Sequence, residues 1–209
     1  MGKLKVEQYV VGPVQTNCYF VINEETKELL VIDPGAGAKQ LAGRVREQGL
    51  KAAAILLTHG HFDHAAGAQE LAAGLGVQIY IHEADKETLA DPKSNVSWMM
   101  GEGAVYQADI FLKDGQELDL AGFHIRVLHT PGHTVGGACY YFPYEDTLFS
   151  GDTLFCGSVG RTDFEGGSMA KLVRSIKEKL LVLPERTVVY TGHGEATTIE
   201  SERMYNSYL

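Results

Sequence analysis

The first third of the chain alternates short apolar runs with turns. Three of these runs are rich in β-branched and aromatic residues, and they cover residues 4–11, 17–22 and 29–32. The third run ends at the turn sequence Asp33-Pro34-Gly35. Runs of this length separated by turns predict an antiparallel meander of three strands.

After the meander the spacing of apolar residues becomes helical. Leu41, Ala42 and Val45 predict a helix over residues 38–48, and the apolar run 53–57 predicts a buried strand. Further elements follow from the same rules, with helices expected over 65–73 and 83–91 and a strand over 77–81. Residues 92–107 show no clean period, which is typical of a mobile loop beside a substrate cleft or of an irregular linker, and we favour the loop.

Strand patterns return in the second half of the chain. They cover residues 117–120, 123–128, 137–142, 147–149 and 187–190, and a helix is expected over 168–181. Two β-rich regions, each closed by helices, predict two sheets with helices outside. No repeat or low-complexity segment divides the sequence, so we expect one domain over residues 1–209.

Composition and charge exclude several classes of protein. The 209 residues are 44% hydrophobic and 22% charged, as in ordinary soluble enzymes. A net charge of -9 disfavours a nucleic-acid partner, because such binding depends on Lys and Arg.

The longest apolar run, residues 52–57, is too short for a membrane span, and the N-terminus lacks a signal-peptide pattern. The three cysteines form no CxxC pair, which indicates a reducing, cytoplasmic location.

The strongest chemical signal directly follows the predicted strand 53–57. The segment Thr58-His59-Gly60-His61-Phe62-Asp63-His64 contains four potential metal ligands within six positions. Residues two apart in an extended segment point the same way, so His59 and His61 can bind one ion. Asp63 and His64, at the start of the next helix, can turn toward a second ion. A polar surface loop is the alternative, and this dense spacing disfavours it.

Three further candidates lie just past other predicted strands. They are His133 in His-Thr-Pro-Gly-His-Thr, Asp152 in Ser-Gly-Asp-Thr and His193 in Thr-Gly-His-Gly. Turn residues place each of these side chains at the end of a strand, where all of them can converge with the first cluster. Together the candidates supply enough ligands for two zinc-like ions.

This pattern, HxHxDH followed by a distant His, Asp and His, resembles the metallo-β-lactamase superfamily over essentially the whole chain. The resemblance implies an α+β fold, a four-layer αββα sandwich. It also implies the metal ligands, with His59, His61 and His133 on one ion, Asp63, His64 and His193 on the other, and Asp152 bridging them.

Differences from some branches of the superfamily narrow down which branch the chain resembles. Asp152 stands where many true β-lactamases of this fold carry cysteine, and His61 stands where the flavodiiron oxygen reductases use glutamate. The acidic net charge disfavours the nuclease branch. Residues 12–18, 160–163 and 192–203 are similar to the short bacterial glyoxalase II-like proteins, which implies a thioester hydrolase.

Other activities stay open at this point. The Gly-Arg-Thr-Asp segment at 160–163 also resembles the mononuclear-iron persulfide dioxygenases. Longer glyoxalase II enzymes bind glutathione with a C-terminal helical domain and with a tyrosine where this chain has Glu195, so we expect weak glutathione binding or another thiol carrier. Lactones and other activated esters suit the same chemistry. A metal-binding scaffold without turnover is disfavoured because no ligand position is missing.

The predicted mechanism is hydrolysis by a metal-activated water. The cofactors would be two divalent ions, zinc first and iron or manganese as alternatives, and Asp63 would both bind metal and orient the attacking water. The partner would be a small-molecule thioester, because a thiolate leaves without a general acid. We expect Arg161 to contact the anionic part of the substrate, or else to pair with Asp163 and hold its loop.

Overall fold

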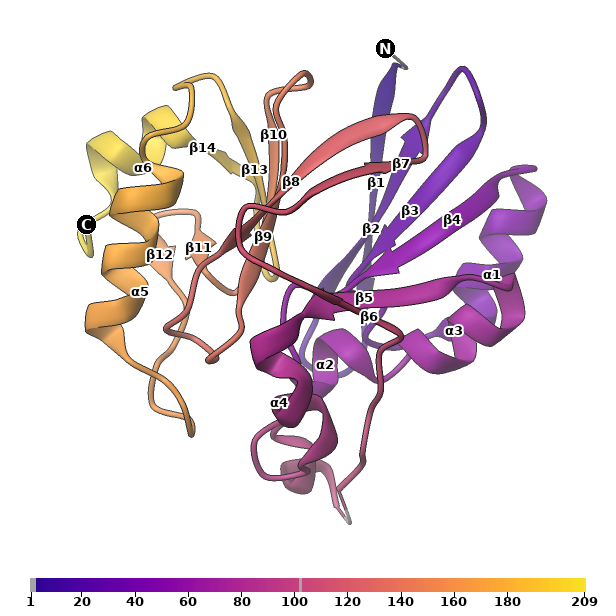
Figure 1. Ribbon diagram of the computed structural model, residues 1–209, viewed down its shortest axis with the longest axis horizontal. Coiled ribbons are helices and arrows are strands. Elements are labelled where there is room, and N and C mark those ends of the chain that lie inside the picture. The colour runs from indigo at the N-terminus through magenta and orange to yellow at the C-terminus, as the bar shows by residue number, and fades with distance from the viewer. Residues whose placement is uncertain (1–2, 102) are drawn as a thin grey trace.

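Two mixed β-sheets face each other in the computed structural model, which describes residues 3–101 and 103–209 (Figure 1). In the first sheet the strand order is β1-β2-β3-β4-β5-β6. These strands span Leu4–Val11, Thr16–Asn23, Glu28–Ile32, Lys51–Leu56, Gln78–His82 and Ile110–Leu112. The strands β1 to β3 form the predicted antiparallel meander, whereas β3 to β6 run parallel because helical crossovers connect them.

The second sheet has the strand order β14-β13-β10-β9-β8-β7. Its strands, taken along the chain from β7 to β10 and then β13 and β14, span Glu117–Leu120, Phe123–His129, Ala138–Phe142, Thr147–Gly151, Val188–Thr191 and Thr197–Thr198. A short hairpin of β11 (Leu154–Phe155) and β12 (Ser158–Val159) follows β10. The pair β10 and β13 is parallel, since helix α5 (Met169–Ser175) and its continuation η3 (Ile176–Leu180) lie between them in the chain.

Every residue of strand β2 is buried, so both faces of the first sheet must be covered by other parts of the chain. Alternate side chains enter different cores. Phe20 packs in the cluster that includes Leu41 of α1 (Ala38–Glu47) and Leu71 of α3 (Ala68–Leu75). Its neighbour Tyr19 packs in the cluster between the sheets, beside Phe149 of the second sheet. Both faces of the first sheet are therefore covered, one by helices and one by the second sheet.

The outer face of the second sheet carries a third apolar core. Leu148 and Val189 pack there against Leu172 of α5 and Ile199 of α6 (Ile199–Tyr205). The layers are thus helices, sheet, sheet and helices, and the predicted α+β sandwich is confirmed. Among the described residues no helix combines the length and the apolar character that crossing a membrane would need.

Some predicted helices are broken in the structure. The helix expected over 65–73 is divided into α2 (Phe62–Ala65) and α3, with Gly67 between them. A Cβ at Gly67 would lie 2.4 Å from the carbonyl oxygen of Pro34, so the backbone packs closely there. The helix expected over 83–91 begins as the 3-10 turn η1 (Glu83–Asp85) and continues as α4 (Lys86–Ala90).

The segment expected to be a loop, residues 92–107, contains the short 3-10 helix η2 (Ser97–Met100). The Asn95 side chain fixes it by donating hydrogen bonds to the carbonyl oxygens of Leu89 at 3.0 Å and Ala104 at 2.9 Å. The buried Asn95 amide thus ties together the two ends of a segment that has little regular structure.

Candidate metal centre

The seven predicted ligands come together where strands of both sheets end. His59, His61, Asp63 and His64 follow β4 and lie in the loop and the first turn of α2. The other ligands follow β8, β10 and β13, and they are His133, Asp152 and His193. Segments far apart in the sequence therefore contribute to one cluster, as the strand-end argument predicts.

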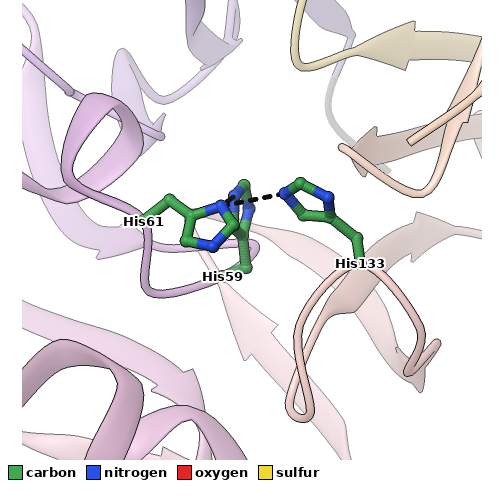
Figure 2. A group of neighbouring side chains, drawn as sticks. All are labelled: His59, His61 and His133. Carbon is green, nitrogen blue, oxygen red and sulfur yellow. Dashed lines mark hydrogen bonds between the residues drawn. The ribbon is translucent and has the colours of Figure 1, made fainter. Parts of the chain in front are cut away.

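Three imidazoles form the first group, and Figure 2 shows them turned toward one another. The Nδ1 atom of His61 lies 3.1 Å from Nε2 of His59 and 2.9 Å from Nε2 of His133. A proton on one nitrogen can satisfy only one such contact, whereas a cation among the three accepts all three lone pairs. The geometry therefore suits a metal ion.

The outer nitrogens of this group are fixed by hydrogen bonds. The Thr58 hydroxyl donates to Asp33 Oδ2 at 2.7 Å, so it accepts the hydrogen bond from His59 Nδ1 at 3.1 Å. His133 Nδ1 donates to the carbonyl oxygen of Arg161 at 2.7 Å. With their protons on Nδ1, His59 and His133 present Nε2 lone pairs to the centre.

The second group consists of Asp63, His64 and His193. Asp63 Oδ2 lies 3.4 Å from His64 Nε2 and 3.2 Å from His193 Nε2. His64 donates from Nδ1 to Asp33 Oδ2 at 2.9 Å, which leaves its Nε2 directed at the group. Two imidazoles and one carboxylate thus surround a second potential cation site.

Asp152 lies between the two groups. Its Oδ1 is 3.4 Å from His64 Nε2, and its Oδ2 is 3.4 Å from His133 Nε2. Oδ2 is also 3.7 Å from His193 Nε2, so the carboxylate lies within reach of both groups, as a bridging ligand must.

The electrostatics of the cluster also fit cations. Burial and the neighbouring imidazoles hold the pKa of His59 far below its usual value, and they lower the pKa of His61 to about 3, so both are neutral ligands. Burial disfavours the Asp152 carboxylate, but His64 lowers its pKa to about 2. Among the described residues, the buried atoms His64 Nε2 and Asp152 Oδ1 have no hydrogen-bond partner. The residues therefore suit a dinuclear metal site.

Two aspartates that the sequence analysis did not select support the ligands. Asp33, besides holding His64, accepts a hydrogen bond from the Thr58 amide at 2.8 Å. Asp85, fully buried, accepts from the amides of Gly60 at 2.9 Å and Gly136 at 2.7 Å, and it thereby joins the loops of the first motif and of His133. Asp33 follows a predicted strand, as the ligands do, and the same rule could have found it. Asp85 lies in a predicted helix and carried no such signal.

The segment 12–18 has a structural role at the second group. Asn17 donates from Nδ2 to the carbonyl oxygens of Thr191 and Gly194, each at 3.0 Å, and so holds the loop of His193. The Thr16 hydroxyl donates to Asp63 Oδ2 at 2.8 Å. This segment therefore positions two members of the second group, Asp63 directly and His193 through its loop.

A cavity of about 250 Å³ opens above the ligands. Besides Phe62, five apolar side chains line the cavity, and we call them the apolar wall: Val14, Val96, Met99, Met100 and Phe164. Arg161 also lines the cavity. Its guanidinium donates two hydrogen bonds of 2.7 Å to the carboxylate of Asp163 and lies 4.0 Å from the centre of the Phe164 ring. The pair with Asp163 is the loop-holding role that the sequence left open beside substrate binding.

Sequence comparisons agree with this architecture. The sequence model of the Metallo-beta-lactamase superfamily matches residues 11–193. The Bacillus subtilis protein named "Probable metallo-hydrolase YqgX" is 40% identical over 208 residues, which are 99% of this chain and 98% of that protein. Hydroxyacylglutathione hydrolase GloC of Haemophilus influenzae is 36% identical over 210 residues, with the same coverage of 99% and 98%.

Solved structures agree as well. The BLEG-1 B3 metallo-β-lactamase superposes with a TM-score of 0.92 at 39% identity, covering 98% of this chain and 99% of that one. TTHA1623 in a di-iron-bound form gives a TM-score of 0.85 at 35% identity, with coverage of 97% and 100%. ETHE1 from Myxococcus xanthus gives a TM-score of 0.79 at 27% identity, covering 97% of this chain and 83% of that one. Because the family match covers strands β2 to β13 and every predicted ligand, the chain belongs to the metallo-β-lactamase superfamily of metallo-hydrolases.

Proposed function

We propose that the protein is a dinuclear-metal thioester hydrolase of the type II glyoxalase kind, acting on a hydroxyacyl thiol. The observation that carries this proposal is the pair of ligand groups with Asp152 between them, at the floor of an accessible cavity. Two divalent ions in these groups, zinc first and iron or manganese as alternatives, would activate water as a nucleophile and polarise the substrate carbonyl.

The residues around the ions have separate tasks in this proposal. Asp63 would bind metal and orient the attacking water, and the hydrogen bond from Thr16 fixes the position of its carboxylate. Asp33 and Thr58 hold the imidazoles with their lone pairs toward the centre. The apolar wall excludes bulk water from one side of the carbonyl.

The cavity lining favours a thioester over an amide. Apart from the ligands, Arg161 is the one residue among those lining the cavity that has an ionisable proton, and its hydrogen bond to Asp163 raises its pKa further. No side chain there acts as a general acid near neutral pH. A thiolate leaves without protonation, because the pKa of a thiol is about 8.5, whereas an amide nitrogen must be protonated.

The similarity to a hydroxyacylglutathione hydrolase, at 36% identity over nearly the whole chain, supports the same substrate class. We also propose a small-molecule partner and a cytoplasmic location, where the free cysteines Cys18, Cys139 and Cys156 stay reduced.

A second candidate is a mononuclear-iron enzyme that oxidises a persulfide with oxygen. One observation favours it. His59, His64 and Asp152 form a set of two histidines and one carboxylate, as the second group also does, and this is the ligand set of many iron oxygenases. A lactone or ester hydrolase is a variant of the main proposal and uses the same residues.

The test is hydrolysis by zinc-loaded protein of a matched thioester, oxygen ester and amide that share one acyl group. We expect turnover of the thioester to be fastest and turnover of the amide, including a β-lactam, to be slowest. Faster cleavage of the β-lactam than of the thioester would contradict the proposal. Oxygen consumption on a persulfide, without thioester cleavage, would favour the iron enzyme.

A further inference from the structure

Part of the apolar wall is exposed to solvent, although Val96 is buried. Met99 and Met100 are each 57% exposed, and Trp98 beside them is 55% exposed. Val14, which also belongs to the wall, is 46% exposed. Apolar side chains gathered at the mouth of a ligand-lined cavity indicate a surface that binds another apolar group.

The basic side chains on the two segments that carry the wall, Lys93 and Arg161, are already paired with carboxylates. Arg161 is held by Asp163 through two hydrogen bonds of 2.7 Å. Lys93, in the segment that carries the methionines, forms an ion pair of 3.0 Å with Glu165, which follows Phe164. This second pair joins the two sides of the wall. A negatively charged substrate group would have to compete with Asp163 or Glu165 for either cation.

We propose that the cavity selects thioesters in which the group lying against the wall is apolar and uncharged. This inference rests on the proposed function and names its substrate class. Methionine side chains are flexible, so the wall adapts to chains of different shape and discriminates by charge and apolar area. Binding of a carboxylate there would leave a charge beside apolar surface, which is unfavourable.

The first experiment compares thioesters of one neutral thiol, N-acetylcysteamine, in zinc-loaded protein. We expect kcat/KM to rise about threefold with each methylene from acetyl to butanoyl, because each methylene buries apolar area. The succinyl thioester should be at least about tenfold slower than the pentanoyl thioester of equal length. A second series keeps the acetyl group and varies the thiol, with neutral and carboxylate-bearing members.

Variants then assign the preference to the wall. The double substitution of Met99→Ser and Met100→Ser should remove most of the increase in kcat/KM per methylene. Met204→Ser is the matched control, since Met204 on α6 is 58% exposed and does not line the cavity. Asp163→Asn, which frees Arg161, should raise kcat/KM for the succinyl thioester and leave the pentanoyl thioester unaffected.

The outcomes separate the two proposals. If the thioesters are hydrolysed but neither series depends on chain length or charge, the wall does not select substrate and this inference is wrong. If no thioester is hydrolysed, the proposed function fails and the inference fails with it. Sedimentation velocity gives a further check, because a wall covered by a second copy of the chain would make the double variant lose a dimer instead of its substrate preference.

Discussion

The two sides of the cavity differ in how their residues are held. On the ligand side, the outer nitrogens of His59, His64 and His133 each donate to a fixed oxygen. On the opposite side, Met99 and Met100 are exposed. Rigid polar anchoring suits chemistry that needs defined geometry, and an adaptable apolar surface suits selection among similar substrates. The difference predicts that changes on the ligand side alter turnover or stability, while changes on the wall alter substrate preference.

The largest effect is expected from the ligands themselves. Asp152→Asn weakens the bridge between the groups, and His61→Ala opens one ligand set. We expect kcat to fall by about a thousandfold or more, because bound metal stabilises the transition state by several kcal/mol. Circular dichroism should stay close to that of the unchanged protein.

A histidine outside the cluster provides the control. His124, on β8, pairs with Asp119 at 3.0 Å, and His124→Ala should leave kcat unchanged. Activity near the original level in Asp152→Asn or His61→Ala, with metal still bound, would show that these residues are not essential ligands.

The second-largest effect is expected at Asp85, which joins the loop of His59 and His61 to the loop of His133. Asp85→Ala removes the acceptor for the Gly60 and Gly136 amides and for the hydroxyls of Thr88 and Thr134. Because these donors are buried, we expect the free energy of unfolding to fall by about 3 kcal/mol, measured by urea denaturation. The methionine double variant should change it by less than about 1 kcal/mol. An equal loss of unfolding free energy in Asp85→Ala and in the methionine double variant would contradict the contrast between the ligand side and the apolar wall.

A smaller effect tests the close packing around the bridge. A Cβ at Gly192 would lie 2.1 Å from Asp152 Oδ1, so Gly192→Ala must displace that carboxylate. We expect metal affinity to fall about 10-fold to 100-fold, measured by competition with a chelating dye. Gly74→Ala is the control, because nothing lies within 4 Å of its added Cβ, and it should not weaken metal binding. Unchanged affinity in Gly192→Ala would place Asp152 outside the metal centre.

The smallest effect is expected at Arg161. Its ion pair with Asp163 is exposed, with side-chain exposures of 57% and 66%, and exposed pairs contribute little to stability. Since Asp163 already accepts two hydrogen bonds from the guanidinium, Arg161→Ala should change KM by less than about threefold, and equally for neutral and carboxylate-bearing thioesters. An increase of about tenfold in KM for the carboxylate-bearing thioester alone would make Arg161 a counter-ion for substrate and would contradict the apolar selection.

The sequence indicated the histidines and aspartates that cluster in the structure because each one stands in a short motif just after a strand. It predicted the layers because apolar runs mark strands that are covered on both faces. It could not reveal Asp85, whose role depends on Gly60 and Gly136 meeting in space. The division of α2 from α3 likewise depends on the approach of Gly67 to Pro34. Contacts between distant segments leave no local pattern in the sequence. The apolar wall, whose residues come from three separate segments, is a further feature that the sequence could not reveal.

The most direct test of the account is the metal content of protein purified without chelator, measured by elemental analysis together with thioester hydrolysis. The account predicts two divalent ions per chain, with activity lost on chelation and restored by adding metal. A single iron per chain, with oxygen consumed on a persulfide and no thioester cleaved, would contradict it.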